Sequence, residues 1–354
     1  MKILFLVPYP SEQAPSQRFR YEQYLEVLEA SGHSYHIASF LNNKTWSILY
    51  KKGYNFLKFT GILKGFGNRL LMLFGIRNYD VVFIHREASP IGPPIFEWLI
   101  AKVFRKKIIY DFDDAIWLSN SSQQNKLAAK LKWHKKVDKI CKWSYKISVG
   151  NDYLGDYARQ FNPQVVFNPT TIDTENLHNQ IKKQDGKKIV IGWTGTHSTM
   201  GYLKVLVPII KKLEGKYDFE FSVISNQKPD LPLKSLTYKP WNKLTEIDDL
   251  LHFNIGVMPL TDDKWAKGKC GFKALQYMAL GIPAIASPVG VNTTIISHGI
   301  DGYLCKNKEE WYLALEKLIK DEQLRIKVGK NSRKKVVEHY SILSNKNNFL
   351  RLFD

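Results

Sequence analysis

The sequence predicts an α/β protein of two domains, each built on a parallel sheet. Short, fully apolar runs of the kind buried in parallel sheets alternate with stretches of helical spacing along the chain. The 354 residues exceed what one hydrophobic core usually organises. A polar, charged stretch at residues 174–188 separates two such series and is the best linker candidate.

The first series begins at the N-terminus. Apolar runs predict strands at residues 2–7, 35–40, 80–84, 107–110, 147–149 and 165–167, and helical spacing predicts helices at 17–30, 95–104, 124–143 and 152–160. The first strand, the loop at 8–16 and the helix and strand that follow form the start of a βαβ unit.

The second series begins at residue 188. Its predicted strands cover residues 188–193, 219–224, 238–241, 253–258 and 284–286, and its predicted helices cover 202–213, 272–280, 309–320 and 322–339. Residues 340–354 are also expected to be helical and to cross back to the first domain. We therefore expect domains at 1–170 and 171–338, with a crossing helix at 339–354.

The composition limits which kinds of binding partner and which cellular compartment we expect for this protein. The formal net charge of +19 implies an acidic partner: nucleic acid, an anionic membrane or a phosphorylated substrate. Three widely spaced cysteines argue against a disulfide framework or a zinc site and for a reducing compartment. The N-terminal apolar run is cut short by Pro8 without a cleavage site, and no stretch reaches the ~18 apolar residues of a membrane span. We expect a cytoplasmic protein.

Residues 41–79 combine basic and aromatic side chains and contain no acidic residue. This mixture suits a surface that rests on anionic lipid headgroups, which would place the protein peripherally on the inner face of the cell membrane. Two alternatives remain for the same residues. One or two helices could bury the aromatic rings and leave the lysines in water, or the rings could stack on single-stranded nucleic acid. We prefer the membrane interpretation and expect no nucleic acid partner.

The stretch at 267–304 carries the clearest chemical signal. Gly271 suits a tight turn, helical spacing follows it, and Gly281 suits the left-handed position that ends a helix. Three lysines surround the start of this helix: Lys267, Lys269 and Lys273. Free N–H groups and the helix dipole attract a phosphate or diphosphate to such a place. Gln276, one turn on, could then bond hydroxyls of the attached group; the alternative is a structural helix with solvated lysines.

Two further loops of the second series carry small residues directly after a predicted strand. Gly195, Thr196 and His197 follow residues 188–193, and Gly290 opens the turn after residues 284–286. Small residues there allow backbone N–H groups to approach a phosphate or a base. His197 is interpreted as a ligand contact, with an exposed loop residue as the alternative.

Polar residues also mark the first series. His85 and Glu87 lie just past the strand at 80–84, where ligand-facing residues collect in α/β folds. Arg18 and Arg20 stand at the start of the first helix. They could hold an anionic acceptor or be solvated.

Carboxylates follow the strand at 107–110. Asp111, Asp113 and Asp114 could hold Mg²⁺, act as a base or orient hydroxyls, and the last two could instead cap a helix. A two-metal site would need carboxylates from other strands, and none is identifiable. Hydroxyl orientation or domain architecture is therefore preferred to a metal site.

The run GFKALQYMALGIPAIASPVG resembles the donor-binding segment of family 4 glycosyltransferases, which have two facing Rossmann-like domains, the GT-B fold. IGWTGTHSTMGYL resembles the first strand and loop of their C-terminal domain, FNPTTID their interdomain segment and GIDGYL their downstream glycine pattern. The resemblance implies a retaining glycosyltransferase (EC 2.4) with a UDP- or GDP-sugar donor on the C-terminal domain and a glycan or lipid-linked acceptor on the N-terminal domain. It implies no cofactor and no metal.

The resemblance departs from the family pattern at three positions. The family's two donor-motif glutamates fall on Gly268 and Gln276, and its loop arginine falls on Thr196. Lysines near the helix start are expected to supply the diphosphate charge instead. Two other functions fit the same sequence: a nucleotide-sugar epimerase of similar fold, and a non-catalytic basic scaffold.

These inferences give three sets of site residues. The donor-binding set is Gly195, Thr196, His197, Lys267, Lys269, Gly271, Phe272, Gln276 and Gly290. The acceptor-binding set is Arg18, Arg20, His85 and Glu87. The catalytic set is Asp111 and Asp113, which would orient hydroxyls, and Lys273, which would stabilise the leaving diphosphate.

Overall fold

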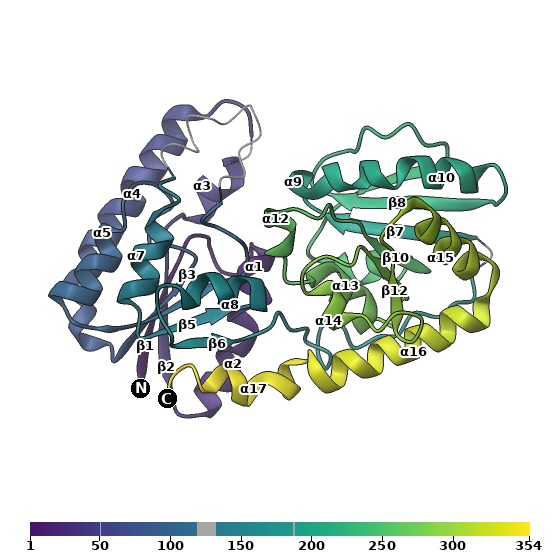
Figure 1. Ribbon diagram of the computed structural model, residues 1–354. Coiled ribbons are helices and arrows are strands. Elements are labelled where there is room, and N and C mark those ends of the chain that lie inside the picture. The colour runs from purple at the N-terminus through teal and green to yellow at the C-terminus, as the bar shows by residue number, and fades with distance from the viewer. Residues whose placement is uncertain (50, 119–131, 187) are drawn as a thin grey trace. The chain divides into compact units, whose positions relative to one another are not determined.

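The computed structural model describes residues 1–49, 51–118, 132–186 and 188–354 of the chain (Figure 1). The chain divides into two compact units. Unit 1 combines Met1–Thr170 with Lys346–Asp354, and unit 2 comprises Thr171–Asn345. Each unit contains a six-stranded sheet whose paired strands are all parallel, so the predicted α/β fold class is confirmed.

The sheet of unit 1 has the strand order β2-β1-β3-β4-β5-β6. Its strands are β1 (Lys2–Val7), β2 (Ser34–Ser39), β3 (Val81–His85), β4 (Lys107–Phe112), β5 (Lys146–Val149) and β6 (Val165–Phe167). The central strands are buried and mostly apolar, as is typical of parallel strands covered on both faces: β1 is buried after Lys2, and β3 is buried along its whole length. The register pairs His85 with Asp111 at the carboxyl edge, which places two predicted site residues side by side.

Helices cover both faces of this sheet (Figure 1). They are α1 (Pro15–Arg18), η1 (Glu22–Tyr24), α2 (Leu25–Ala30), α3 (Asn43–Ile48), α4 (Asn55–Phe74), η2 (Ile76–Asn78), α5 (Ile95–Trp98), η3 (Leu99–Val103), α7 (Lys136–Trp143), α8 (Asp152–Arg159) and α17 (Ile342–Leu350). Right-handed crossovers place α4, α5 and α7 on one face. The opposite face carries α2 and the end of α17.

Aromatic rings pack on the face that carries α2 and α17. Phe349 stacks on Tyr24 with 4.4 Å between ring centroids, and Phe353 lies 6.5 Å from Phe5 and 6.3 Å from Phe83. Burying such rings contributes about 1.5–3 kcal/mol each. The C-terminal segment therefore completes the core of unit 1, as expected for a chain that crosses back.

Three predicted helices of unit 1 differ from the structure. The helix expected at 17–30 is interrupted after α1, where the Phe19 carbonyl accepts a hydrogen bond from the Gln23 side chain (3.1 Å). The helix expected at 95–104 continues from α5 into η3, a π-helical turn. Of the helix expected at 124–143, residues 124–131 lie outside the described residues, and α7 forms only from Lys136 onward.

The sheet of unit 2 has the strand order β12-β11-β10-β7-β8-β9. Its strands are β7 (Ile189–Gly195), β8 (Phe219–Ser225), β9 (Leu236–Pro240), β10 (Ile255–Met258), β11 (Ala284–Ala286) and β12 (Gly302–Leu304). Its helices are α9 (His197–Met200), η5 (Gly201–Val205), α10 (Val207–Glu214), α11 (Glu246–Leu250), α12 (Lys264–Lys267), α13 (Phe272–Ala279), α14 (Asn292–Ile295), α15 (Lys308–Lys320) and α16 (Glu322–His339).

Several elements of unit 2 differ from expectation, among them the short helices α9, α12 and α14, which were not predicted. The helix predicted at 202–213 is split, and α10 starts so that Pro208 lies in its first turn. Proline is tolerated there because it lacks only an N–H that has no partner within the helix. β12 was not predicted, because its three residues include a glycine and carry no periodic signal.

Glycines let the elements of unit 2 pack closely. A Cβ on Gly192 in β7 would lie 2.1 Å from the Phe253 ring, and one on Gly256 in β10 would lie 2.3 Å from the Tyr277 ring. The Tyr277 hydroxyl in turn accepts a hydrogen bond from the Thr194 backbone N–H (2.9 Å). Helix α13 is thereby seated directly on the central strands.

We expect Gly192→Ala to destabilise unit 2 by about 1–3 kcal/mol, because its methyl group would overlap the Phe253 ring. Urea unfolding measures the loss. The matched control is Gly201→Ala, since a Cβ at Gly201 meets nothing within 4 Å. Its stability should stay within about 1 kcal/mol of the parent chain. Equal stability of the two variants would contradict the close packing of β7.

Candidate functional site

The predicted donor-binding residues lie at one edge of the unit 2 sheet. β11, β10 and β7 are neighbours, and their carboxyl ends share an edge because the strands are parallel. The loops after these strands carry the glycines and lysines singled out in the sequence. The structure thus brings together residues that are far apart in the chain.

Gly271 opens helix α13 in the left-handed conformation, with φ of 70°. A Cβ there would lie 2.1 Å from Ile295 Cδ1, so both the conformation and the packing require glycine. Gly281 has φ of 67° just beyond the helix, as predicted for its C-terminal end. The helix start therefore has the backbone geometry that the sequence predicted.

Lys273 reaches across the end of β7. Its Cε would lie 2.8 Å from a Cβ on Gly195, and its Nζ lies 5.6 Å from the centroid of the Trp193 ring. The absence of a side chain at Gly195 therefore makes room for the lysine. The start of α13 and the loop after β7 form one cluster, and Lys273 is the cation that joins them.

The other two lysines have different surroundings. Lys267 Nζ lies 3.1 Å from Asp262 Oδ1 in an exposed pair, and Lys269 Nζ lies 4.9 Å from the centroid of the Trp265 ring. Gly290, with φ of 55°, approaches the Lys267 backbone: a Cβ there would lie 2.8 Å from its carbonyl oxygen. The loop after β11 thus packs against the loop that leads into α13.

The polar residues at this edge of the sheet differ in their burial and in their hydrogen bonds. Gln276 is only 5% exposed, so its amide lies within the unit rather than on its surface. The His197 backbone N–H donates to Asn226 Oδ1 (2.9 Å), and Asn226 Nδ2 lies 3.0 Å from His197 Nδ1. Thr196 is exposed, and its hydroxyl pairs with Ser198 (2.7 Å). Phe272, the first residue of α13, is half-buried.

Sequence reasoning missed three residues of this edge. Asn226 orients His197 from the end of β8, and Tyr277 anchors α13. Buried Asn292 donates to the Ser287 carbonyl (3.0 Å), while its Oδ1 has no hydrogen-bond partner within the described part of the chain. The small residues in the loops predicted a close approach of the backbone to a ligand, but nothing in the sequence pattern indicated the roles of these three side chains.

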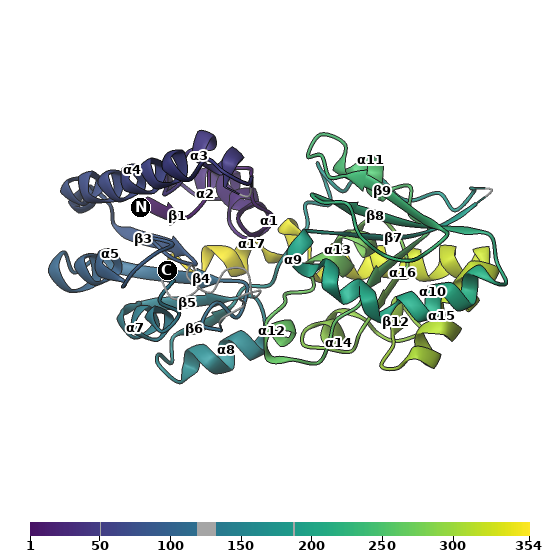
Figure 2. The same cartoon turned by 90° about the horizontal axis from the view of Figure 1, so that it is seen from above.

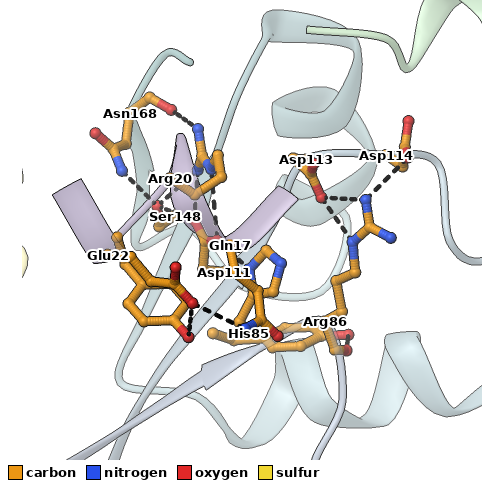
Figure 3. Close-up of polar contacts among 12 residues, drawn as sticks. Gln17, Arg20, Glu22, His85, Arg86, Asp111, Asp113, Asp114, Ser148 and Asn168 are labelled. Carbon is orange, nitrogen blue, oxygen red and sulfur yellow. Dashed lines mark hydrogen bonds and ion pairs between the residues drawn. The ribbon is translucent and has the colours of Figure 1, made fainter. Parts of the chain in front are cut away.

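A second polar cluster surrounds Asp111 in unit 1 (Figure 3). The Asp111 carboxylate accepts hydrogen bonds from Ser148 Oγ (2.6 Å) and His85 Nδ1 (2.7 Å) and forms an ion pair with Arg20. Arg20 also donates to Ser148 Oγ (3.2 Å) and to the Asn168 carbonyl. The carboxylate therefore joins β4 to β3, to β5 and to the segment after α1.

Burial and charge act in opposite directions on Asp111. Burial alone would raise the pKa of this carboxyl, but Arg20 and His85 hold its pKa well below its usual range. The carboxylate is fully buried, and both oxygens are occupied by protein donors. Two expectations change accordingly: Asp111 is not placed to orient the hydroxyl of a ligand directly, and Arg20, also buried, does not present a cation to an acceptor.

His85 has one nitrogen committed and one available. An ionised carboxylate can only accept, so the Nδ1 facing Asp111 carries the proton. Nε2 is buried and has no hydrogen-bond partner in the portion of the chain that is described. Buried polar atoms are normally paired, so this orphaned nitrogen is a candidate position for a bound water.

Gln17 and Glu22 extend this cluster and were not predicted. Gln17 Nε2 donates to Glu22 Oε1 (3.0 Å) and to the Tyr9 carbonyl (3.1 Å), and the Glu12 N–H donates to Glu22 Oε2 (2.8 Å). Burial raises the pKa of Glu22. These bonds shape the loop between β1 and α1.

Asp113 and Asp114 face Arg86. The guanidinium donates to Asp113 Oδ1 (2.7 Å) and to Asp114 Oδ2 (3.0 Å). Burial would lower the pKa of Arg86, but the two carboxylates raise it above its usual value. Arg86 also has φ of 60°, a strained conformation for a residue with a side chain. The Asp113 carboxylate is thus engaged by Arg86 and not presented alone to a ligand.

Glu87 lines a small pocket of unit 1. Its carboxylate pairs with Lys136 Nζ (2.7 Å). The pocket has a volume of about 30 Å³ and is lined by Tyr9, Arg86, Glu87, Ile116, Lys132, His134, Lys136 and Val137. Arg18 is half-buried, with its guanidinium 5.1 Å from the centroid of the Phe19 ring.

The described residues contain no group of three or more His, Cys, Asp or Glu side chains arranged to hold a metal ion. None of their helices combines the length and the apolarity that crossing a bilayer requires.

Part of unit 2 is similar to a known protein family. Residues 234–335 match the family model described as "Glycosyl transferases group 1". A curated relative, N-acetyl-alpha-D-glucosaminyl L-malate synthase of Bacillus anthracis, is 36% identical over 76 residues. That alignment covers 21% of this chain and 20% of the relative, so it spans about a fifth of either protein.

Solved structures resemble the whole chain. Sucrose-phosphate synthase from Thermosynechococcus elongatus has a TM-score of 0.71 at 12% identity and covers 100% of this chain and 98% of its own. A glycosyltransferase from Rickettsia africae has a TM-score of 0.71 at 16% identity, covering 99% and 97%. Anabaena HepE in complex with UDP-glucose has a TM-score of 0.67 at 11% identity, covering 100% and 99%. The chain has the GT-B fold of two Rossmann-like domains, and the family match within unit 2 supports a GT-B glycosyltransferase.

Proposed function

We propose that this protein is a retaining glycosyltransferase that moves a sugar from a UDP- or GDP-sugar to a glycan or lipid-linked acceptor. The observation that carries the proposal is the cluster at the start of α13. It lies within the matched family segment and combines a left-handed glycine, a helix N-terminus and Lys273 beside the end of β7. Similar structures hold UDP and UDP-glucose, which supports a nucleotide-sugar donor.

The donor diphosphate would lie at the N-terminus of α13. Backbone N–H groups at a helix N-terminus and the positive end of the helix dipole attract a diphosphate. Lys273 supplies a full positive charge on the same side, and the glycines at 195, 271 and 290 let the backbone approach the ligand. Lys267 and Lys269, which are partly exposed, would contribute to the surrounding potential.

The energetic problem in glycosyl transfer is negative charge on the leaving diphosphate. Fixed cations and oriented N–H groups stabilise such charge without reorganisation during the reaction. Removing one such donor typically costs about 10²–10³ in rate. In a retaining transfer on one face, the departing phosphate oxygen can take the acceptor proton, so a strong protein base is unnecessary. Retention is drawn from the resemblance of the donor segment.

The acceptor side would lie in unit 1 at the carboxyl edge of β3 and β4. His85 Nε2 is the orphaned group there. Because it is buried, it would accept from a bound water that in turn contacts a sugar hydroxyl, with Nδ1 carrying the proton. Asp111 would act through His85, by holding its tautomer and orientation, rather than by touching the acceptor. Glu87 and Arg18 are the more accessible members of the predicted acceptor set.

A panel of UDP- and GDP-sugars, with nucleotide release as the measurement, tests the proposal. We expect at least one donor to be turned over, faster with a glycan or lipid-linked acceptor than with water. NMR of the product should show the anomeric configuration of the donor. Release of an epimerised nucleotide-sugar would instead indicate the epimerase, and no binding of any nucleotide would indicate a scaffold.

We expect Lys273→Ala to lower kcat/KM about 100-fold, because the leaving diphosphate loses its nearest fixed cation. UDP or GDP affinity, measured by calorimetry, should fall with it. The control is Lys327→Ala, which removes an exposed lysine of α16 and should leave both quantities unchanged. Unchanged nucleotide affinity in a folded Lys273→Ala protein would remove the donor site from α13.

We expect Asp111→Asn to destabilise unit 1 by about 3 kcal/mol at pH 7, because it breaks a buried ion pair. The pKa of Asp111 is depressed in the folded chain, so its stabilising effect is complete above the unfolded pKa of about 3.9. It is lost as pH falls below that value. The difference between variant and parent in urea unfolding should therefore shrink below about pH 4.

The matched control for that experiment is Asp156→Asn. Asp156 forms an exposed pair with Arg159 (2.8 Å), and such pairs contribute less than about 1 kcal/mol. If Asp111→Asn lowers the free energy of unfolding as little as the control does, the buried network around Asp111 does not stabilise unit 1.

A further inference from the structure

Helix α4 turns an apolar stripe outward. Phe56, Phe59, Leu63, Leu70 and Phe74 are between 52% and 86% exposed. Their spacings of three, four and seven residues place them on one face of the helix. Figures 1 and 2 show α4 as a long helix on the outside of unit 1. An amphipathic helix normally buries this face, so its exposure needs an explanation.

The opposite face of α4 explains the orientation. A Cβ on Gly61 would lie 2.2 Å from the Thr45 hydroxyl, and one on Gly65 would lie 2.7 Å from the Phe40 ring. Only glycines permit this close approach of the helix backbone. The rotation of α4 about its own axis is therefore set by its glycine face and not by its apolar one.

Arg69 locks the same rotation. Its guanidinium is buried and donates to three backbone carbonyls, those of Ala88 (2.7 Å), Ala38 (2.8 Å) and Val7 (2.9 Å). Burial lowers the pKa of Arg69 to about 10, so the group stays charged at neutral pH. Rotating the apolar stripe inward would pull this charge away from its partners. The exposed stripe is thus built into the fold of unit 1.

The surroundings of the stripe are basic. Residues 41–79 contain no acidic residue, and five of their cations are exposed: Lys44, Lys51, Lys52, Lys64 and Arg77. α5 lies next to α4, with 6.0 Å between the Phe66 and Phe96 ring centroids, and it adds exposed Ile95 and Trp98. The surface therefore combines large apolar side chains with positive charge.

We infer that α4 lies flat on an anionic lipid bilayer, with its apolar stripe inserted into the headgroup–acyl boundary and its lysines on the lipid phosphates. Apolar insertion together with cations fits this one partner. A second copy of the chain would bring the same cations face to face, which like-charge repulsion opposes. A nucleic acid would meet the lysines but would leave the leucines of the stripe without an apolar environment. The inference is independent of the glycosyl-transfer proposal.

Vesicle flotation with the full chain tests the inference. We expect binding to vesicles with about 30 mol% phosphatidylglycerol and about 10-fold weaker binding to pure phosphatidylcholine. Raising the salt to about 0.5 M should weaken the anionic binding, because it screens the lysines. Equal binding to both vesicle types, or none to either, would overturn the inference.

The discriminating variant combines Phe59→Gln, Leu63→Gln and Leu70→Gln. All three side chains are exposed, so the fold should be preserved, which circular dichroism checks. Vesicle partitioning should fall about 100-fold. The matched control, Leu313→Gln with Ile326→Gln, changes exposed apolar residues of unit 2 and should bind as the parent does. A different result would show that the stripe is a self-association surface and that the inference is wrong. In that case the parent is a dimer by gel filtration, the triple variant is a monomer, and neither protein binds vesicles.

Discussion

The buried Asp111 carboxylate is the interaction on which the architecture of unit 1 depends most. It accepts hydrogen bonds from Ser148 and His85 and forms an ion pair with Arg20. It therefore connects β4 to its two neighbours, β3 and β5, and to the segment after α1. A buried charge is costly unless every lone pair is used, and here protein donors use both oxygens. Because the carboxylate is satisfied internally, it can orient His85 without being available itself.

Ligand-facing residues collect at the carboxyl ends of strands in α/β folds, and His85 occupies this position at the end of β3. One ring nitrogen faces Asp111, and the other is buried without a partner among the residues described. A histidine fixed at one nitrogen offers a defined acceptor at the other. The same strand end carries Arg86 with its strained backbone and its two carboxylates, so the edge is densely charged yet internally balanced.

Glycine packing has the corresponding role in unit 2 and on α4. Gly192 and Gly256 bring α13 and Phe253 onto the central strands, and Gly195 makes room for Lys273. On α4, Gly61 and Gly65 bring the helix backbone onto α3 and the loop after β2, while Arg69 holds three carbonyls. In both units a missing side chain decides which neighbouring side chains face outward. The two proposed binding features lie beside these glycines: Lys273 next to Gly195 in unit 2, and the apolar stripe on the face of α4 opposite Gly61 and Gly65.

The sequence by itself determined the α/β class, most of the strands and the left-handed glycines around α13, because these follow from local periodicity and backbone sterics. It also indicated the basic, aromatic character of residues 41–79. Tertiary structure decided which polar residues are buried. Asp111 and Arg20 are residue types that usually lie on the surface, and only the folded chain shows that they form a buried ion pair. It likewise decided which face of α4 meets solvent. Periodicity defines the apolar stripe of α4. Whether that stripe faces solvent or the core depends on contacts with residues distant in the chain, and the local sequence does not determine those contacts.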